Sequence, residues 1–249
     1  MDWVRLVRPR ICSGQPDFPA AAARGFRRMR GNMIMNEILS RGIEDMRVIH
    51  AMHEVPRERF LPAGQELRAS ANTALDIGEG QTIAEPLVVA LMTAALELKA
   101  GDKVLEVGTG SGYQAAILAE IVGKRGLGRI GHVYTIERIP LLAERSKELL
   151  SKLGYGNISV ITGDGSIGLP EKAPFDAIIV TAGGPGVHKS LIKQLVDGGR
   201  FVIPFGRGTH NMSLAIGTRH GDDVEFQKID GFGFVPLIGE YGFPEGFEG

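Results

Sequence analysis

The chain has 249 residues, of which 43% are hydrophobic, so it is long enough to bury the core of one large domain. Its 28 basic and 29 acidic residues nearly balance, which excludes a bulk field that would attract nucleic acid or a membrane surface. The single Cys12 excludes internal disulfides and cysteine-based metal sites, and no apolar run reaches the ~20 residues that span a bilayer. We therefore expect a cytoplasmic protein, working as a monomer, without nucleic-acid, membrane or metal partners.

The first 30 residues differ from the rest of the chain in composition. They contain seven Arg, three Pro and only two acidic residues, Asp2 and Asp17. An Arg-rich, acid-poor start is typical of targeting segments, but no amphipathic period supports that interpretation. We predict that residues 1–32 are a disordered or mis-started leader, with a functional basic arm as the alternative.

Residues 33–242 are predicted to form a single domain that begins with helices. NEILSRGIEDMRVIHAMHEV has apolar residues at roughly helical spacing and predicts two short helices. The prolines of VPRERFLP, residues 55–62, end this helical unit. His50 and His53 have the i, i+3 spacing of a metal pair, but no carboxylate or cysteine partner is specified. Exposed helix histidines are therefore the favoured interpretation.

The stretch GQTIAEP, residues 80–86, leads into the apolar sequence LVVALMTAALEL. The latter is typical of a helix that Pro86 opens at its first turn. This arrangement brings the polar side chains of Gln81 and Thr82 to a helix N-terminus, where backbone N–H groups lack partners. The loop therefore indicates a ligand contact at the start of an α/β unit over residues 81–242.

From residue 102 onward, short apolar strands alternate with amphipathic helices. This pattern is typical of a Rossmann-like α/β fold, with a mostly parallel, doubly wound sheet covered on both faces. The predicted strands are residues 102–107, 132–137, 157–162, 175–181, 198–206 and 211–217, and the predicted helices are residues 113–122, 140–153 and 188–195.

Near the C-terminus, GFGFVPLIGEYG covers residues 231–242. Val235 and Leu237 alternate there with Phe234 and Pro236, which favours an edge strand. The last residues, 243–249, are predicted to be a flexible tail.

VLEVGTGSGYQAA, residues 104–116, carries the strongest chemical motif of the chain. It places Gly108, Gly110 and Gly112 between a strand and a helix, where a tight turn and a close ligand require glycine. A dinucleotide fingerprint would need its third glycine where Tyr113 stands, which disfavours an NAD-linked oxidoreductase. The remaining ExGxGxG pattern suits S-adenosylmethionine (SAM), because the carboxylate of Glu106 can attract the ammonium of its amino-acid part.

Acidic residues and glycines also follow the next two strands. Glu137 ends the second strand, where a carboxylate can accept both hydroxyls of a ribose. Asp164, in GDGS, can accept a hydrogen bond from an adenine amino group, and Gly165 leaves room for the ring. Each of these residues also has a purely structural interpretation, as a helix-start charge or a turn residue. Their succession at strand ends favours one shared ligand crevice.

Together these segments resemble the protein-L-isoaspartate (D-aspartate) O-methyltransferase family over roughly residues 33–239. The resemblance rests on VPRERFLP, IGEGQTIAEP, VLEVGTGSGYQAAILAEIVG, VYTIER, LGYGNISVITGDGS, APFDAIIVTA, LVDGGRFVIPFG and FVPLIG. It implies a SAM-dependent enzyme that methylates the free carboxylate of L-isoaspartyl, and of D-aspartyl, residues in damaged proteins. The methylated chain can then close to a succinimide and reopen partly as normal aspartate, which begins repair.

The resemblance also implies roles for individual residues. Cofactor binding would fall to Gln81, Thr82, Ile83, Glu106, Gly108, Thr109, Gly110, Ser111, Gly112, Glu137, Arg138, Asp164, Gly165 and Thr181. Substrate binding would fall to Asn72 and Ile77, in a substrate loop that closes the helical part at residues 33–80, and to Val235, Pro236 and Leu237.

The chain departs from the family pattern on the substrate side. Family members usually have a serine in QTIS, where this chain has Ala84. They also usually have an acidic residue and prolines in the preceding loop, where this chain has Asn72, Ala74 and Asp76. The chemistry needs no general base, because the substrate carboxylate is already ionised at neutral pH. We assign the role of orienting that carboxylate to Thr82. Two alternatives remain open: a divergent methyltransferase for another carboxylate, and a SAM-binding protein without catalysis.

Overall fold

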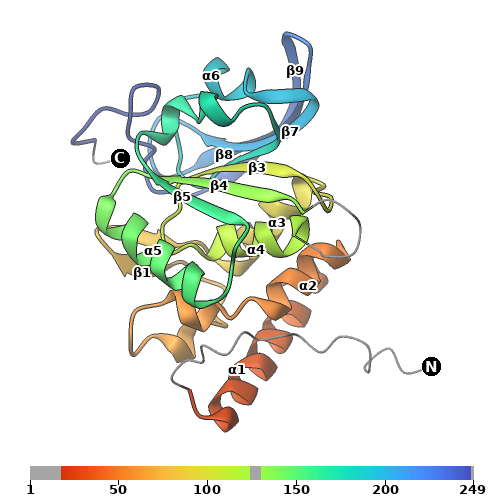
Figure 1. Cartoon of the computed structure of the whole chain (residues 1–249), viewed down its shortest axis with the longest axis vertical. Coiled ribbons are helices and arrows are strands. Elements are labelled where there is room, and N and C mark those ends of the chain that lie inside the picture. Colours follow the sequence, from red (N-terminus) through yellow and green to blue (C-terminus); the bar gives the residue numbers. More distant parts are fainter. Residues whose placement is uncertain (1–17, 124–129, 248–249) are drawn as a thin grey trace.

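A seven-stranded β-sheet runs through the centre of the computed structural model, which describes residues 18–123 and 130–247 (Figure 1). The strands are β3 (Lys103–Val107), β4 (His132–Glu137), β5 (Ile158–Thr162), β6 (Phe175–Val180), β7 (Leu195–Phe205), β8 (Met212–His220) and β9 (Asp223–Phe232). Their order is β5-β4-β3-β6-β7-β8-β9, parallel from β3 to β7 and antiparallel at β8 and β9. The mostly parallel α/β fold is thus confirmed.

The chain changes direction across the sheet between β3 and β6. From β3 it winds outward through β4 and β5, and it then returns to place β6 on the other side of β3. In open α/β sheets, ligands bind beyond the carboxyl ends of the strands at such a switch point. The topology therefore marks the ends of β3, β4 and β6 as the place to look for a site.

The sheet is covered on both faces, and each face has its own hydrophobic core (Figure 1). Because successive side chains of a strand point to opposite faces, Val104 packs in one core and Leu105 in the other. The first core includes helices α3 (Pro86–Ala95), α4 (Tyr113–Val122) and α5 (Pro140–Lys152). The second includes the short helix α6 (Lys189–Ile192) and residues beside the 3₁₀ turns η6 (Gly165–Ile167) and η7 (Pro170–Lys172). The sheet is doubly wound, although its second layer is thin.

The N-terminal unit packs beneath α3 and α4. It comprises helix α1 (Ala20–Met33), the π-helical turn η2 (Ile34–Ile38), the 3₁₀ turns η3 (Leu39–Arg41), η4 (Arg57–Phe60) and η5 (Glu66–Arg68), and helix α2 (Met46–Glu54). The two predicted helices of this region are present as η2–η3 and α2. Asp45 caps α2 by accepting a hydrogen bond from the backbone N–H of Arg47 at 2.9 Å.

The predicted disordered leader is wrong for residues 20–32. They form most of α1, whose buried face carries Phe26, Arg30 and Met33. The Arg30 guanidinium donates to both oxygens of Glu58, at 3.0 and 2.8 Å, inside the protein. Three of the seven arginines that suggested a leader, Arg24, Arg27 and Arg28, lie exposed on this helix, so composition alone concealed a docked element. Residues 1–17 lie outside the described part of the chain.

Four further parts of the fold differ from the sequence prediction. The helix expected over residues 188–195 is the single turn α6, because β7 already begins at Leu195. The outer strand β9 and the hairpin of β1 (Leu75–Gly78) and β2 (Gln81–Ile83) were not predicted. The edge strand expected over residues 231–242 is instead an extended segment after β9. It lies beside Gly183, whose backbone N–H donates to Val235 O and whose carbonyl accepts from Leu237 N, both at 2.8 Å.

Within residues 18–123 and 130–247, none of the helices combines the length and the apolar character needed to cross a bilayer. No set of three His, Cys, Asp or Glu side chains in these ranges is arranged around a common metal position. His53 instead contacts the Glu54 carboxylate through Nδ1 at 3.0 Å.

Candidate active site

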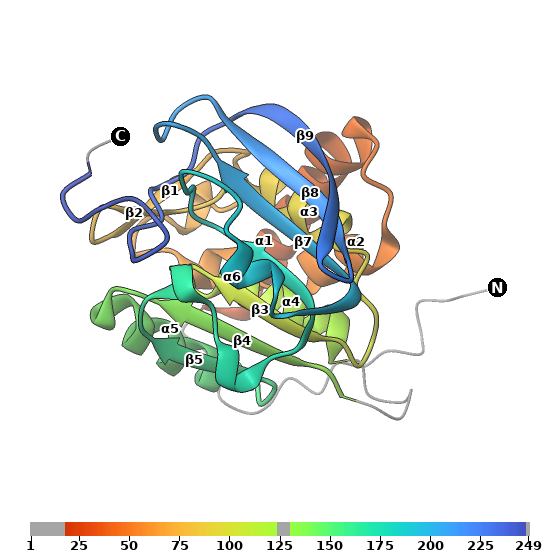
Figure 2. The same ribbon diagram turned by 90° about the horizontal axis from the view of Figure 1, so that it is seen from above.

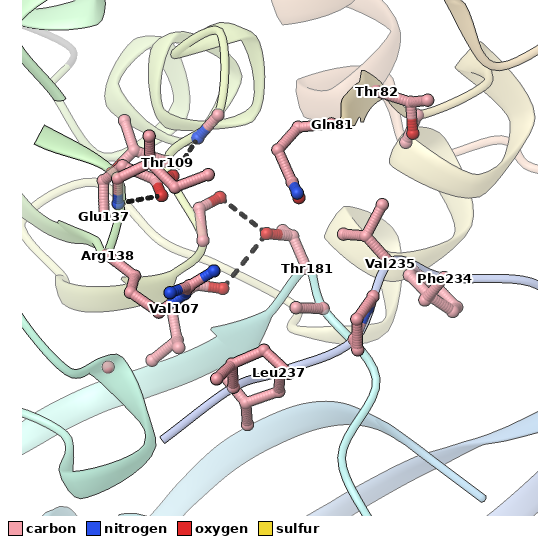
Figure 3. A pocket seen from close by; sticks show the side chains of 18 of the residues that line it. Gln81, Thr82, Val107, Thr109, Glu137, Arg138, Thr181, Phe234, Val235 and Leu237 are labelled. Atoms are coloured by element: carbon pink, nitrogen blue, oxygen red, sulfur yellow. Dashed lines mark hydrogen bonds between the residues drawn. The ribbon is translucent and has the colours of Figure 1, made fainter. Parts of the chain in front are cut away.

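A cavity of about 390 Å³ opens at the switch point of the sheet, beyond the carboxyl ends of β3, β4 and β6 (Figure 3). Of the residues assigned to the site from the sequence, those that line it are Gln81, Thr82, Ile83, Gly108, Thr109, Gly110, Ser111, Glu137, Arg138, Gly165, Thr181, Val235, Pro236 and Leu237. Ala84 lines it as well. The cavity thus joins segments that lie far apart in the sequence.

The glycine turn after β3 brings the backbone up to the cavity. Gly108, Gly110 and Gly112 have φ values of +101°, +51° and +88°, a region that residues with a side chain rarely adopt. A Cβ at Gly108 would collide with the Thr181 hydroxyl. That hydroxyl is held within hydrogen-bond distance of the carbonyl oxygens of Val107 (3.0 Å) and Gly108 (2.6 Å). Gly112 packs against α5 instead and does not line the cavity.

Glu137 connects the glycine turn to the start of α5. One of its carboxylate oxygens accepts from Gly110 N at 2.8 Å, and the other accepts from Ile139 N at 2.9 Å. The residue is only 7% exposed, and that exposure faces the cavity. A carboxylate offers about four lone-pair positions, so two remain for a ligand after these bonds. Gln81 points into the same cavity from the β2 side (Figure 3).

Glu106 does not line the cavity, which corrects its predicted position. Its neighbour Val107 does, and a strand sends consecutive side chains to opposite faces. The Glu106 carboxylate is 0% exposed, and neither oxygen has a hydrogen-bond partner among the described residues. Burial raises the pKa of Glu106 to about 8, only partly offset by the nearby Thr135 hydroxyl. The side chain is therefore mostly neutral at pH 7 and cannot act as a full counter-charge.

Glu106 gives the fold a pH dependence that Glu106→Gln should remove. The unfolded carboxyl loses its proton near its ordinary pKa of 4.5, whereas the folded one keeps it to about 8. Wild-type stability is therefore lost progressively as pH rises between these values. We expect the gap in unfolding free energy, variant minus wild type, to grow by several kcal/mol from pH 5 to pH 8.5 in urea titrations. A gap independent of pH would contradict this account.

A C-terminal strap, residues 239–247, forms the loop that leads to the C-terminal end of the chain (Figure 2), and its last residues line the cavity. Glu245, Gly246 and Phe247 line the cavity, and Arg138 Nη1 holds Glu245 at 3.1 Å. The flexible tail predicted from residue 243 is therefore wrong as far as residue 247, and residues 248 and 249 lie outside the described chain. No local sequence signal marks this contact, because it joins two charges across 107 positions.

Asp164 also faces the strap rather than the cavity lining. Its carboxylate accepts from Glu240 N at 2.8 Å and from the Ser166 hydroxyl at 2.7 Å. Burial raises the pKa of Asp164, but the hydrogen bonds from Glu240 N and from Ser166 outweigh it and hold this pKa below its ordinary value. The adenine contact assigned to Asp164 stays a prediction, and its partner in this structure is the strap backbone.

Two residues that the sequence assigned to substrate binding instead make contacts within the protein. Asn72 Oδ1 accepts from Leu87 N at 3.0 Å and so caps the start of α3 from the preceding loop. Ile77 is 2% exposed and packs over Gly110. Neither lines the cavity, which differs from the prediction. Tyr113 and Phe234, which were not assigned to the site from the sequence, do line it.

Known proteins resemble this chain in both sequence and fold. The family model described as protein-L-isoaspartate(D-aspartate) O-methyltransferase matches residues 28–242. The chain belongs to this family. A protein-L-isoaspartate O-methyltransferase 2 of Pelobacter propionicus is 47% identical over 212 residues, covering 85% of this chain and 91% of the relative. One from Syntrophobacter fumaroxidans is 44% identical over 219 residues, covering 88% of this chain and 98% of the relative.

Solved structures agree with this membership. A protein-L-isoaspartate O-methyltransferase structure superposes with a TM-score of 0.77 at 28% identity, covering 86% of this chain and 67% of the other. A putative one from Plasmodium falciparum, in complex with S-adenosyl-L-homocysteine (SAH), shares the fold with a TM-score of 0.71 at 23% identity, over 86% of this chain and 98% of the other. The enzyme is therefore a SAM-dependent protein carboxyl methyltransferase of Rossmann-like fold.

The residues around the cavity fit SAM. The cavity volume of about 390 Å³ lies within the ~300–1,000 Å³ typical of small-molecule sites. Gly108 leaves the backbone bare where a Cβ would obstruct the turn, and Glu137 keeps acceptor capacity toward the cavity. The roles of individual residues toward SAM stay predictions.

Proposed function

We propose that the enzyme methylates the free carboxylate of L-isoaspartyl residues in damaged proteins and peptides, and that it does so with alanine at position 84. The observation that carries this proposal is the division of the cavity into two sides. Glu137 and the glycine turn form one side, and Gln81–Ala84 with the segment from Phe234 to Leu237 form the other. Of the departures from the family pattern, Ala84 belongs to the second side, whereas Asn72, Ala74 and Asp76 do not line the cavity.

The residues of the site would act by alignment rather than by proton transfer. Bound SAM supplies a methyl group on a positively charged sulfonium. The substrate carboxylate is already ionised at neutral pH, so its attack neutralises opposite charges and needs no general base. In our proposal Glu137 fixes the ribose hydroxyls, and the wall at Gln81–Ala84 holds the carboxylate in line with the methyl group. Orientation of this kind and exclusion of water supply most of the rate.

Because position 84 is alanine, this wall lacks the serine hydroxyl that family members usually have there. Thr82 lines the cavity but is exposed at its rim, on strand β2. The backbone N–H groups just before α3 are the other donors near the reacting position, and a helix N-terminus favours an anion. Thr82 and these N–H groups would together replace part of what a serine hydroxyl contributes.

Replacing Ala84 with serine should therefore accelerate the reaction. A hydroxyl that bonds a charged oxygen contributes ~1–3 kcal/mol, which corresponds to roughly a 5- to 150-fold higher kcat on an isoaspartyl peptide. The affinity for SAH, measured by calorimetry, should not change. Ala84→Cys is the matched control, because its thiol has similar size but is a weak donor, and it should stay near the wild-type rate.

The same assay tests the function. Transfer from SAM to the isoaspartyl peptide by the wild type supports the proposal. If neither the wild type nor Ala84→Ser transfers a methyl group while both bind SAH, the proposal fails. The outcome then favours a different carboxylate substrate or a SAM-binding protein without catalysis.

We also infer that the enzyme works as a monomer in the cytoplasm, without nucleic-acid or membrane partners. The near balance of 28 basic and 29 acidic residues and the single cysteine support this inference. Elution of the full chain at the volume of a 26.8 kDa protein would test the monomer.

A further inference from the structure

Arg57 is the most deeply buried arginine of the described chain, and its guanidinium is surrounded by backbone carbonyls. The side chain is 1% exposed. Nη1 donates to Ala69 O at 2.7 Å and reaches Ala71 O at 3.4 Å, while Nη2 donates to Thr73 O at 3.1 Å and Ala84 O at 3.0 Å. Among the described ion pairs, none involves Arg57. A buried charge is thus stabilised by peptide dipoles from two separate segments.

The first of these segments, residues 69–73, has no helix or strand of its own. Its carbonyls cannot be satisfied by a regular ladder, and a buried carbonyl without a partner is costly. Arg57 supplies donors to three residues of this loop at once. The loop conformation therefore depends on one side chain that lies outside it, on the turn η4.

The second segment is the connection from β2 to α3, where Ala84 lines the cavity. Because Arg57 Nη2 bonds both Thr73 O and Ala84 O, the guanidinium ties the loop to the cavity wall. A second tie runs parallel to it, since Asn72 Oδ1 accepts from Leu87 N. Tyr113 also lines the cavity; burial raises the pKa of its phenol to about 12, and the nearby Arg57 guanidinium opposes that rise.

We propose that Arg57 is a positioning residue, which clamps the loop at residues 69–73 against Ala84 and so sets the substrate-side wall of the cavity. The planar fork of arginine suits this task, because its five donors reach several acceptors in fixed directions. Lysine keeps the charge but is a point donor on a flexible stem, so it cannot hold both segments together. This proposal rests on the proposed function, since the wall matters for catalysis only if it faces the peptide carboxylate.

Arg57→Lys tests the clamp, with Arg30→Lys as the matched control. Arg30 is also buried, at 6% exposure, but it bonds Glu58 and His53 O, and it neither lines the cavity nor bonds the loop at residues 69–73. We expect Arg57→Lys to lower kcat/KM for an isoaspartyl peptide by about 10- to 100-fold, because misplacement of a reacting group by ~1 Å costs about that much. The Kd for SAH should stay within about 3-fold of the wild type. Arg30→Lys should lower the Tm without this change in the kinetics of the folded enzyme.

Two outcomes would overturn the proposal. In one, Arg57→Lys has a lower Tm, but its kcat/KM stays within about 2-fold of that of Arg30→Lys. Arg57 would then serve only the stability of the fold. In the other, SAH binding falls as much as peptide turnover, so that the effect is not confined to the substrate side. Hydrogen exchange at residues 69–73 separates this proposal from the proposed function. Faster exchange in Arg57→Lys but not in Arg30→Lys would support the clamp even if the wild type proved inactive on isoaspartyl peptides, and unchanged exchange would refute it.

Discussion

Replacing Glu137 with alanine should weaken the binding of SAH by about 100-fold or more. Each hydrogen bond to a charged acceptor contributes ~1.5–3 kcal/mol, and the proposed ribose contact has two of them. A change of 1.4 kcal/mol is tenfold in Kd. The substitution also removes the acceptor for Gly110 N and Ile139 N, so the glycine turn loses its anchor. Isothermal titration with SAH measures the result.

Two variants control this experiment. Glu137→Gln keeps one carbonyl acceptor without the charge, and we expect an intermediate Kd. Glu245→Ala removes another carboxylate that lines the cavity, but that one is 78% exposed and paired with Arg138. Exposed ion pairs contribute ~0–1 kcal/mol, so its Kd should change by less than about 5-fold. An effect of Glu245→Ala as large as that of Glu137→Ala would contradict the central place we give to Glu137.

Gly108→Ala should destabilise the fold and abolish measurable SAH binding. The φ of +101° costs an alanine ~1–2 kcal/mol, and overpacking against the Thr181 hydroxyl adds ~1–3 kcal/mol. Because this turn lines the cavity, its displacement moves the backbone that SAM would approach. Thermal unfolding should show a Tm several degrees lower, and calorimetry should show no SAH binding.

The two causes can be separated by a second substitution. Thr181→Ala in the Gly108→Ala background removes the colliding hydroxyl but leaves the backbone strain, so it should recover only part of the lost stability. Gly163→Ala is the control, because a Cβ there has open space and its φ lies outside the left-handed region. An equal fall in Tm in Gly108→Ala and Gly163→Ala would show that the turn has no special requirement for glycine.

The SAM side of the cavity could be predicted because its signals are local. A glycine-rich turn between strand and helix, followed by an acidic residue at the next strand end, identifies Gly108, Gly110 and Glu137 without any knowledge of tertiary contacts. The position of Glu106 could not be predicted in this way. A strand has a period of two, so only one of Glu106 and Val107 lines the cavity, and the structure rather than the sequence shows that it is Val107.

The contacts that fix the loop at residues 69–73, the strap and helix α1 could not be predicted in the same way. The loop at residues 69–73 is held by a guanidinium that bonds carbonyl oxygens, and backbone acceptors leave no pattern of side chains in a sequence. The strap is held by contacts between distant residues, among them the ion pair of Arg138 with Glu245 and the bond from Glu240 N to Asp164. Helix α1 was missed because its many arginines outweighed the apolar residues Phe26 and Met33 on its buried face.

The most direct test of the account is the selectivity of the wild-type enzyme between two peptides that differ only in one linkage. Initial rates with labelled SAM would be measured on an isoaspartyl peptide and on its normal aspartyl twin. We expect efficient transfer to the isoaspartyl peptide and only background transfer to the twin, with Ala84 in place. Equal transfer to both peptides, or transfer to neither by an enzyme that binds SAH, would contradict the assignment of isoaspartyl carboxylates as the substrate.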